Sequence, residues 1–200
     1  MGETNYDLEQ DLNEAKKMVE GLETYVLGDQ VYGSVGGGFF TGGALPSLTI
    51  GALLLRVRRL RARDGELSLQ RRSELDGIEA EIERVHREWT LHFNQKIERE
   101  AASRLKAMGQ YFEEMREDPR TGANAYLPEA LRRTIIAELA QAIETYGIDP
   151  GDLPQRISST DASLRRYTEP ALFIWSSSLE PIYPKQPYWW LYVRPRKPQA

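Results

Sequence analysis

The chain has 200 residues, of which 40% are hydrophobic and 28% are charged, and its formal net charge is −4. A chain of this length buries roughly 70% of its unfolded surface, so it can fold without a disulfide framework. It contains no cysteine, which excludes disulfides, thiol catalysis and cysteine-ligated zinc and is consistent with a reducing compartment.

The chain begins with an acidic segment, MGETNYDLEQDLNEAKK. Apolar residues recur at three- and four-residue spacing between Leu8 and Val26, which predicts an amphipathic helix that ends near Gly28. Thr4 and Asn5 are its candidate N-caps. Because a secretory signal starts with basic residues followed by an apolar run, we expect a cytoplasmic protein.

Residues 28–46 are rich in glycine and predict a loop, with Phe39 and Phe40 as its anchors in the core. Gly33 and Gly38 have the glycine spacing of a phosphate-binding loop, but the two phenylalanines occupy the positions that require Lys and Ser or Thr. We therefore expect no nucleotide site and no cofactor. A small-molecule or enzymatic pocket near this loop stays an alternative.

A second helix is predicted over LTIGALLLRVRRLRAR, with Ser47 as its N-cap. The stretch 30–55 has no charged residue and is as long as a bilayer span. Its apolar core, Leu48 to Leu55, has only the length of a buried core segment. A membrane partner is therefore not expected.

Seven arginines and two acidic residues fall within Arg56 to Arg72. On a helix, Arg56, Arg59 and Arg63 project to one side, which makes them candidates for contact with phosphate or a partner. The sequence has no zinc-finger ligands and no RNA-recognition strand motif. Pairing with the acidic segments of the chain is therefore the favoured explanation, and nucleic-acid association is the alternative.

The stretch from Leu69 to Glu117 has the strongest helical periodicity, with heptad-like first and last parts. As one helix it would be about 70 Å long, whereas a compact protein of this size is about 45 Å across. We therefore expect it to break, to protrude or to pair with a second chain. Gly77 is the first candidate break and Gly109 is the second.

Self-association along this long helix is the leading functional hypothesis. Its apolar stripe supplies the candidate interface residues Ile82, Val85, Trp89 and Phe93. The alternative use of the stripe is the core of the protein itself.

Metal chemistry has one weak starting point, the Glu-x-x-His pair of Glu83 and His86. No second copy of the pair exists, and His92 lies about 240° around the helix from His86. We expect no metal site. No nucleophile motif is present, and although carboxylate pairs leave acid–base hydrolysis open, we do not expect an enzyme.

Two further helices are predicted in the second half of the chain. Pro128 lies at the start of the first, and Gly147 follows its end in the position typical of a helix C-terminus. Ser159 or Thr160 is the candidate N-cap of a short helix through Tyr167.

Residues 170–200 combine β-forming and aromatic residues with prolines, in the segments ALFIW and YWWLYVRP. They predict a small two-stranded unit packed on the helices. In a strand, Trp189 and Trp190 would face opposite sides. We expect them either to lock this unit onto the core or to serve as an interface.

The sequence therefore predicts a mainly α, helical bundle-like domain over residues 1–200, with one very long or bent helix and a small β-rich C-terminal hairpin. The preferred function is that of a scaffold or protein–protein interaction module, either as a homo-oligomer or with another protein. Nucleic-acid association and a ligand pocket are the two alternatives.

Overall fold

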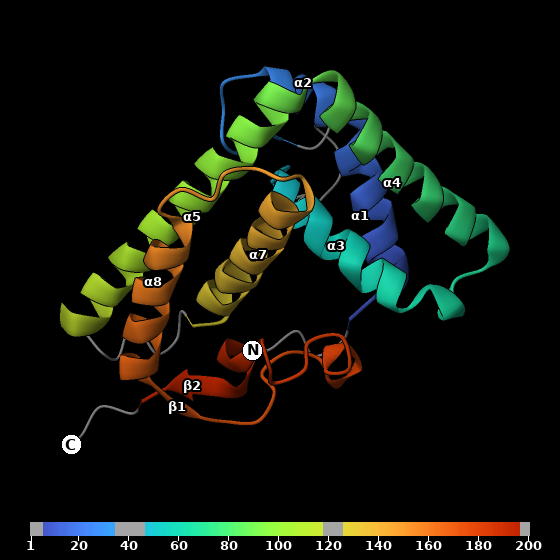
Figure 1. Cartoon of the computed structure of the whole chain (residues 1–200). Coiled ribbons are helices and arrows are strands. Elements are labelled where there is room, and N and C mark those ends of the chain that lie inside the picture. Colours follow the sequence, from blue (N-terminus) through green and yellow to red (C-terminus); the bar gives the residue numbers. More distant parts are fainter. Residues whose placement is uncertain (1–5, 35–46, 118–125, 197–200) are drawn as a thin grey trace. The chain divides into compact units, whose positions relative to one another are not determined.

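The structure is a computed structural model that describes residues 6–34, 47–117 and 126–196 (Figure 1). Within these ranges it contains seven α-helices and one two-stranded antiparallel sheet, so the predicted mainly α class with a C-terminal hairpin is confirmed. Contacts group the chain into an N-terminal unit, Asp7–Glu100, and a C-terminal unit, Ala101–Ala200 with Met1–Tyr6. The prediction of a single domain stays a prediction.

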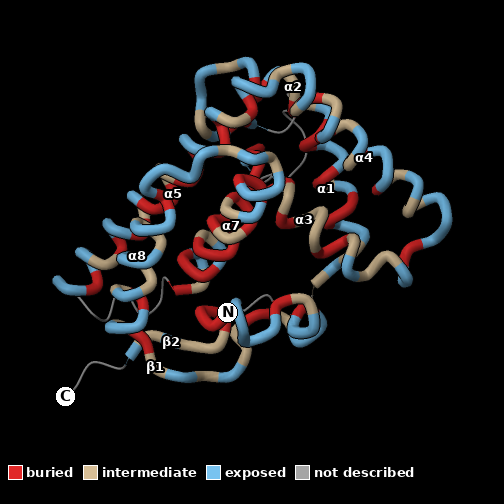
Figure 2. The backbone as a smooth tube through the Cα atoms, viewed as in Figure 1, coloured by how far each residue is buried: buried red, intermediate tan, exposed pale blue. Residues whose placement is uncertain are grey.

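The N-terminal unit is helical throughout its regular structure. It contains α1 (Leu8–Glu20), α2 (Leu22–Leu27), α3 (Ile50–Ala62), α4 (Leu69–Glu88) and the first part of α5 (Thr90–Glu117). Helix α1 packs against α3 and α4 through one buried face (Figure 2). The core includes Leu12, Met18, Leu53, Leu60 and Leu75, all at most 1% exposed.

The predicted first helix is two helices in the structure, and its N-cap is neither of the two candidates. Asp7 caps α1, because its carboxylate accepts the amides of Glu9 and Gln10, and the candidate caps Thr4 and Asn5 lie outside the described residues. The predicted first helix is also interrupted at Gly21, which ends α1 and precedes α2.

Ser47 is not the N-cap of α3. Leu48 forms an isolated bridge with Gly33, with N···O distances of 2.8 and 2.9 Å, and this pairing keeps the backbone extended up to Thr49. The Thr49 hydroxyl then accepts the amide of Ala52 at 3.2 Å. Residues 35–46 of the predicted glycine-rich loop, including Phe39 and Phe40, lie outside the described residues.

The long helix does break, but not at either predicted glycine. Gly77 and Gly109 lie inside α4 and α5, whereas the break falls at Trp89, whose φ of −125° and ψ of 37° are not helical. The hydroxyl of Thr90 donates to the carbonyl of His86 at 2.8 Å, the acceptor that the Thr90 amide would use in a continuous helix. Side-chain competition for this carbonyl accompanies the break.

The C-terminal unit contains the rest of α5, α7 (Tyr126–Thr145), α8 (Leu153–Tyr167), β1 (Thr168–Pro170) and β2 (Val193–Pro195). The strands pair with Glu169 opposite Arg194. Helix α8 starts six residues before Ser159, because Asp152 takes the N-cap position and Pro154, which lacks an amide hydrogen, lies in the first turn. The predicted caps Ser159 and Thr160 are therefore wrong.

The strands are shorter than predicted, and the first lies outside the predicted segment, whereas β2 (Val193–Pro195) is the end of YWWLYVRP. Strand β1 comes before ALFIW, and Trp189–Tyr192 form a 3-10 turn closed by the hydrogen bond from the Leu191 amide to the Tyr188 carbonyl at 3.0 Å. Trp189 and Trp190 therefore do not alternate across a strand, and both are buried.

A pair of glycine substitutions tests this packing. Gly33→Ala is expected to lower the free energy of unfolding by about 1–3 kcal/mol, because its β-carbon would lie 2.8 Å from the Tyr25 ring. Gly77→Ala is expected to raise it by about 0.5–1 kcal/mol, because the helical site is open and alanine has the higher helix propensity. Urea denaturation measures both, and a loss of stability in Gly77→Ala would contradict the continuous helix there.

Candidate functional site

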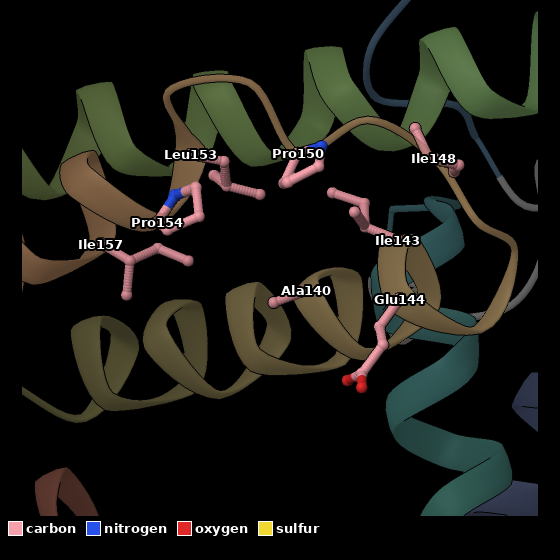
Figure 3. A pocket seen from close by; sticks show the side chains of 8 residues that line it. All are labelled: Ala140, Ile143, Glu144, Ile148, Pro150, Leu153, Pro154 and Ile157. Atoms are coloured by element: carbon pink, nitrogen blue, oxygen red, sulfur yellow. The ribbon is translucent and has the colours of Figure 1, made fainter.

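The candidate site is a pocket of about 510 Å³ in the C-terminal unit, between the end of α7, the start of α8 and the connection that joins them (Figure 3). Seven apolar residues and one acidic residue line it: Ala140, Ile143, Glu144, Ile148, Pro150, Leu153, Pro154 and Ile157.

The end of α7 builds one wall of the pocket. Gly147 has a φ of +65°, a conformation that L side chains disfavour, and it reverses the chain after the helix. The amide of Ile148 then donates to the carbonyl of Ile143 at 2.9 Å, the six-to-one bond of a Schellman motif. This bond holds the two isoleucines beside each other at the pocket.

The start of α8 builds the opposite wall. The turn before it is fixed by a hydrogen bond from the Gly151 amide to the Asp149 carboxylate at 3.0 Å and by one from the Leu153 amide to the Pro150 carbonyl at 3.0 Å. Gly151 also has a positive φ of 52°. Local hydrogen bonds thus fix the backbone on both sides of the pocket.

Acidic side chains flank this apolar lining. Glu144 is exposed, and Figure 3 shows its carboxylate turned away from the apolar side chains. Asp149 and Asp152 are exposed in the connection. Asp152 lies 3.7 Å from Arg156, but its side chain is 77% exposed, so this ion pair is weak. The site therefore suits an apolar group with positive charge beside it.

The C-terminal aromatic residues are locked onto the same unit. Trp190 is 3% exposed, and its indole nitrogen donates to the Thr134 hydroxyl at 2.9 Å. Tyr126 donates to the Trp190 carbonyl at 2.6 Å, and the guanidinium of Arg133 lies 3.9 Å from the Trp190 ring centre. Arg133 also binds both carboxylate oxygens of Asp161, at 2.7 and 3.0 Å.

The candidate interface residues of the long helix are mostly buried. Ile82 is 4% exposed, and Val85 and Phe93 are fully buried, whereas Trp89 is half-buried at the helix break. Trp189, also buried, lies under the guanidinium of Arg165 at 3.7 Å. Of the six candidates, Trp89 alone keeps substantial exposed surface.

The three candidate arginines contact carboxylates within the N-terminal unit. Arg56 binds Glu14 at 2.6 Å, and Arg59, only 4% exposed, lies 3.9 Å from Asp11. Arg63 binds Glu66 at 2.7 Å, which lowers the pKa of that carboxyl.

Two more arginines of this segment also bind carboxylates. Arg61 contacts Asp76 and Glu79, and these contacts raise its pKa. Arg71 contacts Glu9 and Glu74. Most of these arginines thus pair with the acidic segments of the chain, which is the explanation that the sequence favoured. Their role in contact with phosphate or a partner stays a prediction.

Glu129 is a buried carboxyl on α7 that the sequence did not single out. It is 5% exposed; Arg132 binds one of its oxygens, and the other has no hydrogen-bond partner. Burial raises the pKa of Glu129, and the contact with Arg132 acts in the opposite direction. Periodicity alone does not reveal this, because a glutamate at an inward helix position has no distinct pattern.

The described residues were also searched for a metal-binding cluster and for a membrane-spanning helix. In residues 6–34, 47–117 and 126–196, no three His, Asp or Glu side chains come together in a way that would hold a metal ion. None of the helices in these ranges has the length and the apolar character that crossing a bilayer requires.

Comparisons with protein-family models, curated proteins and solved structures found no match to this chain.

The α7–α8 pocket is a feature that the sequence did not predict. The signal that could have indicated it is the run of apolar residues, Ile148, Pro150, Leu153 and Pro154, in and just after a turn-rich connection.

A substitution of Arg133 tests how much its contacts with Asp161 and Trp190 stabilise the C-terminal unit. Arg133→Met is expected to lower the free energy of unfolding by about 2–3 kcal/mol, because Asp161 and the Trp190 ring lose a buried cation. Arg165→Met, at an exposed site over Trp189, is expected to cost less than about 1 kcal/mol. Urea denaturation measures the free energy of unfolding of both variants. Equal losses of stability would contradict the stabilising role assigned to Arg133.

The raised pKa of Glu129 predicts that the free energy of unfolding depends on pH. Its raised folded-state pKa means that its favourable contribution is full below the ordinary value of 4.5 and is lost as the pH rises through the folded-state value. Glu129→Gln is therefore expected to be more stable than the parent at neutral pH, with the difference shrinking towards pH 4.

Thermal unfolding at several pH values measures this difference. Glu113→Gln, at an exposed position on α5, is the control and is expected to change stability by less than about 0.5 kcal/mol. A destabilised Glu129→Gln at neutral pH would show that the ion pair with Arg132 outweighs the cost of burial.

Proposed function

We propose that the protein is a protein–protein interaction module whose α7–α8 pocket accepts an apolar side chain of its partner. The observation that carries this proposal is the composition of the pocket, seven apolar residues with a single carboxylate at the edge. A preformed apolar pocket gains affinity from the side chain it buries and loses little to ordering of its own walls.

The same composition favours binding over catalysis. Sites for small polar ligands and for reactions bring several polar groups together, to orient a ligand or to move a proton. Glu144 is the only titratable side chain lining this pocket, and its carboxylate faces away from the apolar residues. An apolar anchor flanked by lysine or arginine fits this arrangement best.

The proposed interaction surface is the α7–α8 pocket, whereas the sequence favoured the long helix. Ile82, Val85 and Phe93 are already buried, so they offer a partner little area. The cytoplasmic assignment remains part of the proposal and is supported by the absence of cysteine.

A labelled peptide tests the proposal. The probe is a short fluorescein-labelled peptide with one leucine between two lysines, and its control has serine in place of leucine. Fluorescence anisotropy is expected to show binding of the leucine peptide that is at least about tenfold tighter, because burial of a leucine contributes about 1.5–3 kcal/mol.

Two variants of α7 locate the binding. Ala140→Phe is expected to fill the pocket and abolish binding, whereas Gln141→Phe, at the exposed neighbouring position, is expected to leave it unchanged. Failure of the leucine peptide to bind, or equal binding by Ala140→Phe, would overturn the proposal. Circular dichroism confirms that each variant is folded.

A further inference from the structure

Leu172 has the most exposed large hydrophobic side chain in the described part of the chain, at 89%. Pro170, two residues earlier, is also exposed. Exposure of a leucine to this degree leaves nearly all of its apolar surface in water, so burial against a partner would be favourable.

The segment that carries Leu172 is held in place. The Ala171 amide donates to the Tyr192 carbonyl at 2.9 Å, and the Ile174 amide donates to the Leu191 carbonyl at 3.0 Å. Leu172 therefore lies between two fixed points on a segment that is tied to the buried 3-10 turn. A preformed anchor loses little conformational entropy when it binds.

Basic residues outnumber acidic ones in the elements that flank this anchor. Arg165 and Arg166 are exposed at the end of α8, and Arg194 and Arg196 are exposed on the strand side of the hairpin. Glu169, which binds Arg194 at 2.8 Å, and the exposed Glu180 are the acidic residues of 165–196. The net charge of this segment is still positive, whereas the pocket edge has three exposed carboxylates, Glu144, Asp149 and Asp152, and one arginine, Arg156.

The pocket lies at the start of α8, whereas Leu172 follows β1, which begins directly after the end of α8; Figure 1 shows this order of α8 and β1. The pocket includes Leu153–Ile157, and β1 follows directly after Tyr167. A helix of 15 residues is about 22 Å long, so most of the length of α8 separates the pocket from β1 and the segment that carries Leu172. Contact between the two surfaces requires another molecule.

We infer that the occupant of the α7–α8 pocket is Leu172 of a second copy of this chain. This inference rests on the proposed function and names its partner. The contact joins two different surfaces, so two copies can fill each other's pockets in a two-fold dimer, or copies can add head-to-tail into a ring or an open chain.

Sedimentation velocity tests the assembly with the full chain over about 10–300 μM, the range in which weak contacts form. We expect dimers or larger species whose share grows with concentration, and a weaker association when the salt rises from about 50 to about 500 mM. Leu172→Ser and Ala140→Phe are each expected to weaken association at least tenfold. Leu69→Ser, at an 83% exposed leucine of the N-terminal unit, is the matched control and should not change it.

Mixing the two variants tests whether the anchor of one copy fills the pocket of another. Leu172→Ser keeps its pocket, and Ala140→Phe keeps its anchor, so the mixture is expected to form a one-to-one dimer and nothing larger. Glu144→Arg is at an exposed position and is also expected to weaken association, which keeps the test valid if Ala140→Phe does not fold.

Three results would overturn the inference: a monomer at all concentrations, assembly that Leu172→Ser leaves intact, or a mixture of the variants that stays monomeric. If the lysine-flanked leucine peptide still binds the pocket in any of these cases, the proposed function stands and only the self-association fails. If the peptide does not bind either, both fail.

Discussion

The C-terminal unit depends on the buried guanidinium of Arg133. A buried cation destabilises a protein unless hydrogen bonds and opposite charge compensate its loss of water. Arg133 on α7 meets this requirement with the carboxylate of Asp161 on α8 and with the face of Trp190 in the C-terminal segment. One side chain therefore fixes two neighbouring segments against the same helix, and the positions of both the pocket and the exposed hairpin follow from it.

This constraint also explains why the pocket stays open. Ala140 comes seven residues after Arg133, about 10 Å along α7, and Ile157 comes four residues before Asp161, about 6 Å along α8. The ion pair thus holds the two helices together a short distance from the pocket, while Gly147 and Gly151 set the path of the connection at its other side. The walls are held from both directions and cannot simply collapse onto each other.

Local sequence features predicted the parts of the fold that local forces determine. The helical stripe of α7 and the place of Gly147 after its end are of this kind, because spacing and glycine chemistry suffice for both. The cap at Thr49 was missed because it depends on the bridge between Gly33 and Leu48, which are far apart in sequence. The pocket was missed for a similar reason, since an unfilled volume between two helices is a property of their packing and not of either sequence.

The charged residues of the two units differ in how far they pair with each other. In the N-terminal unit the arginines of α3 meet the carboxylates of α1 and α4, so opposite blocks of sequence neutralise each other inside one unit. In the C-terminal unit, exposed arginines at the end of α8 and exposed carboxylates at its start stand at opposite ends of one helix. Because α8 is about 22 Å long, these two groups of described residues form no ion pairs with each other and are paired only locally, as Asp152 is with Arg156 and Arg194 is with Glu169.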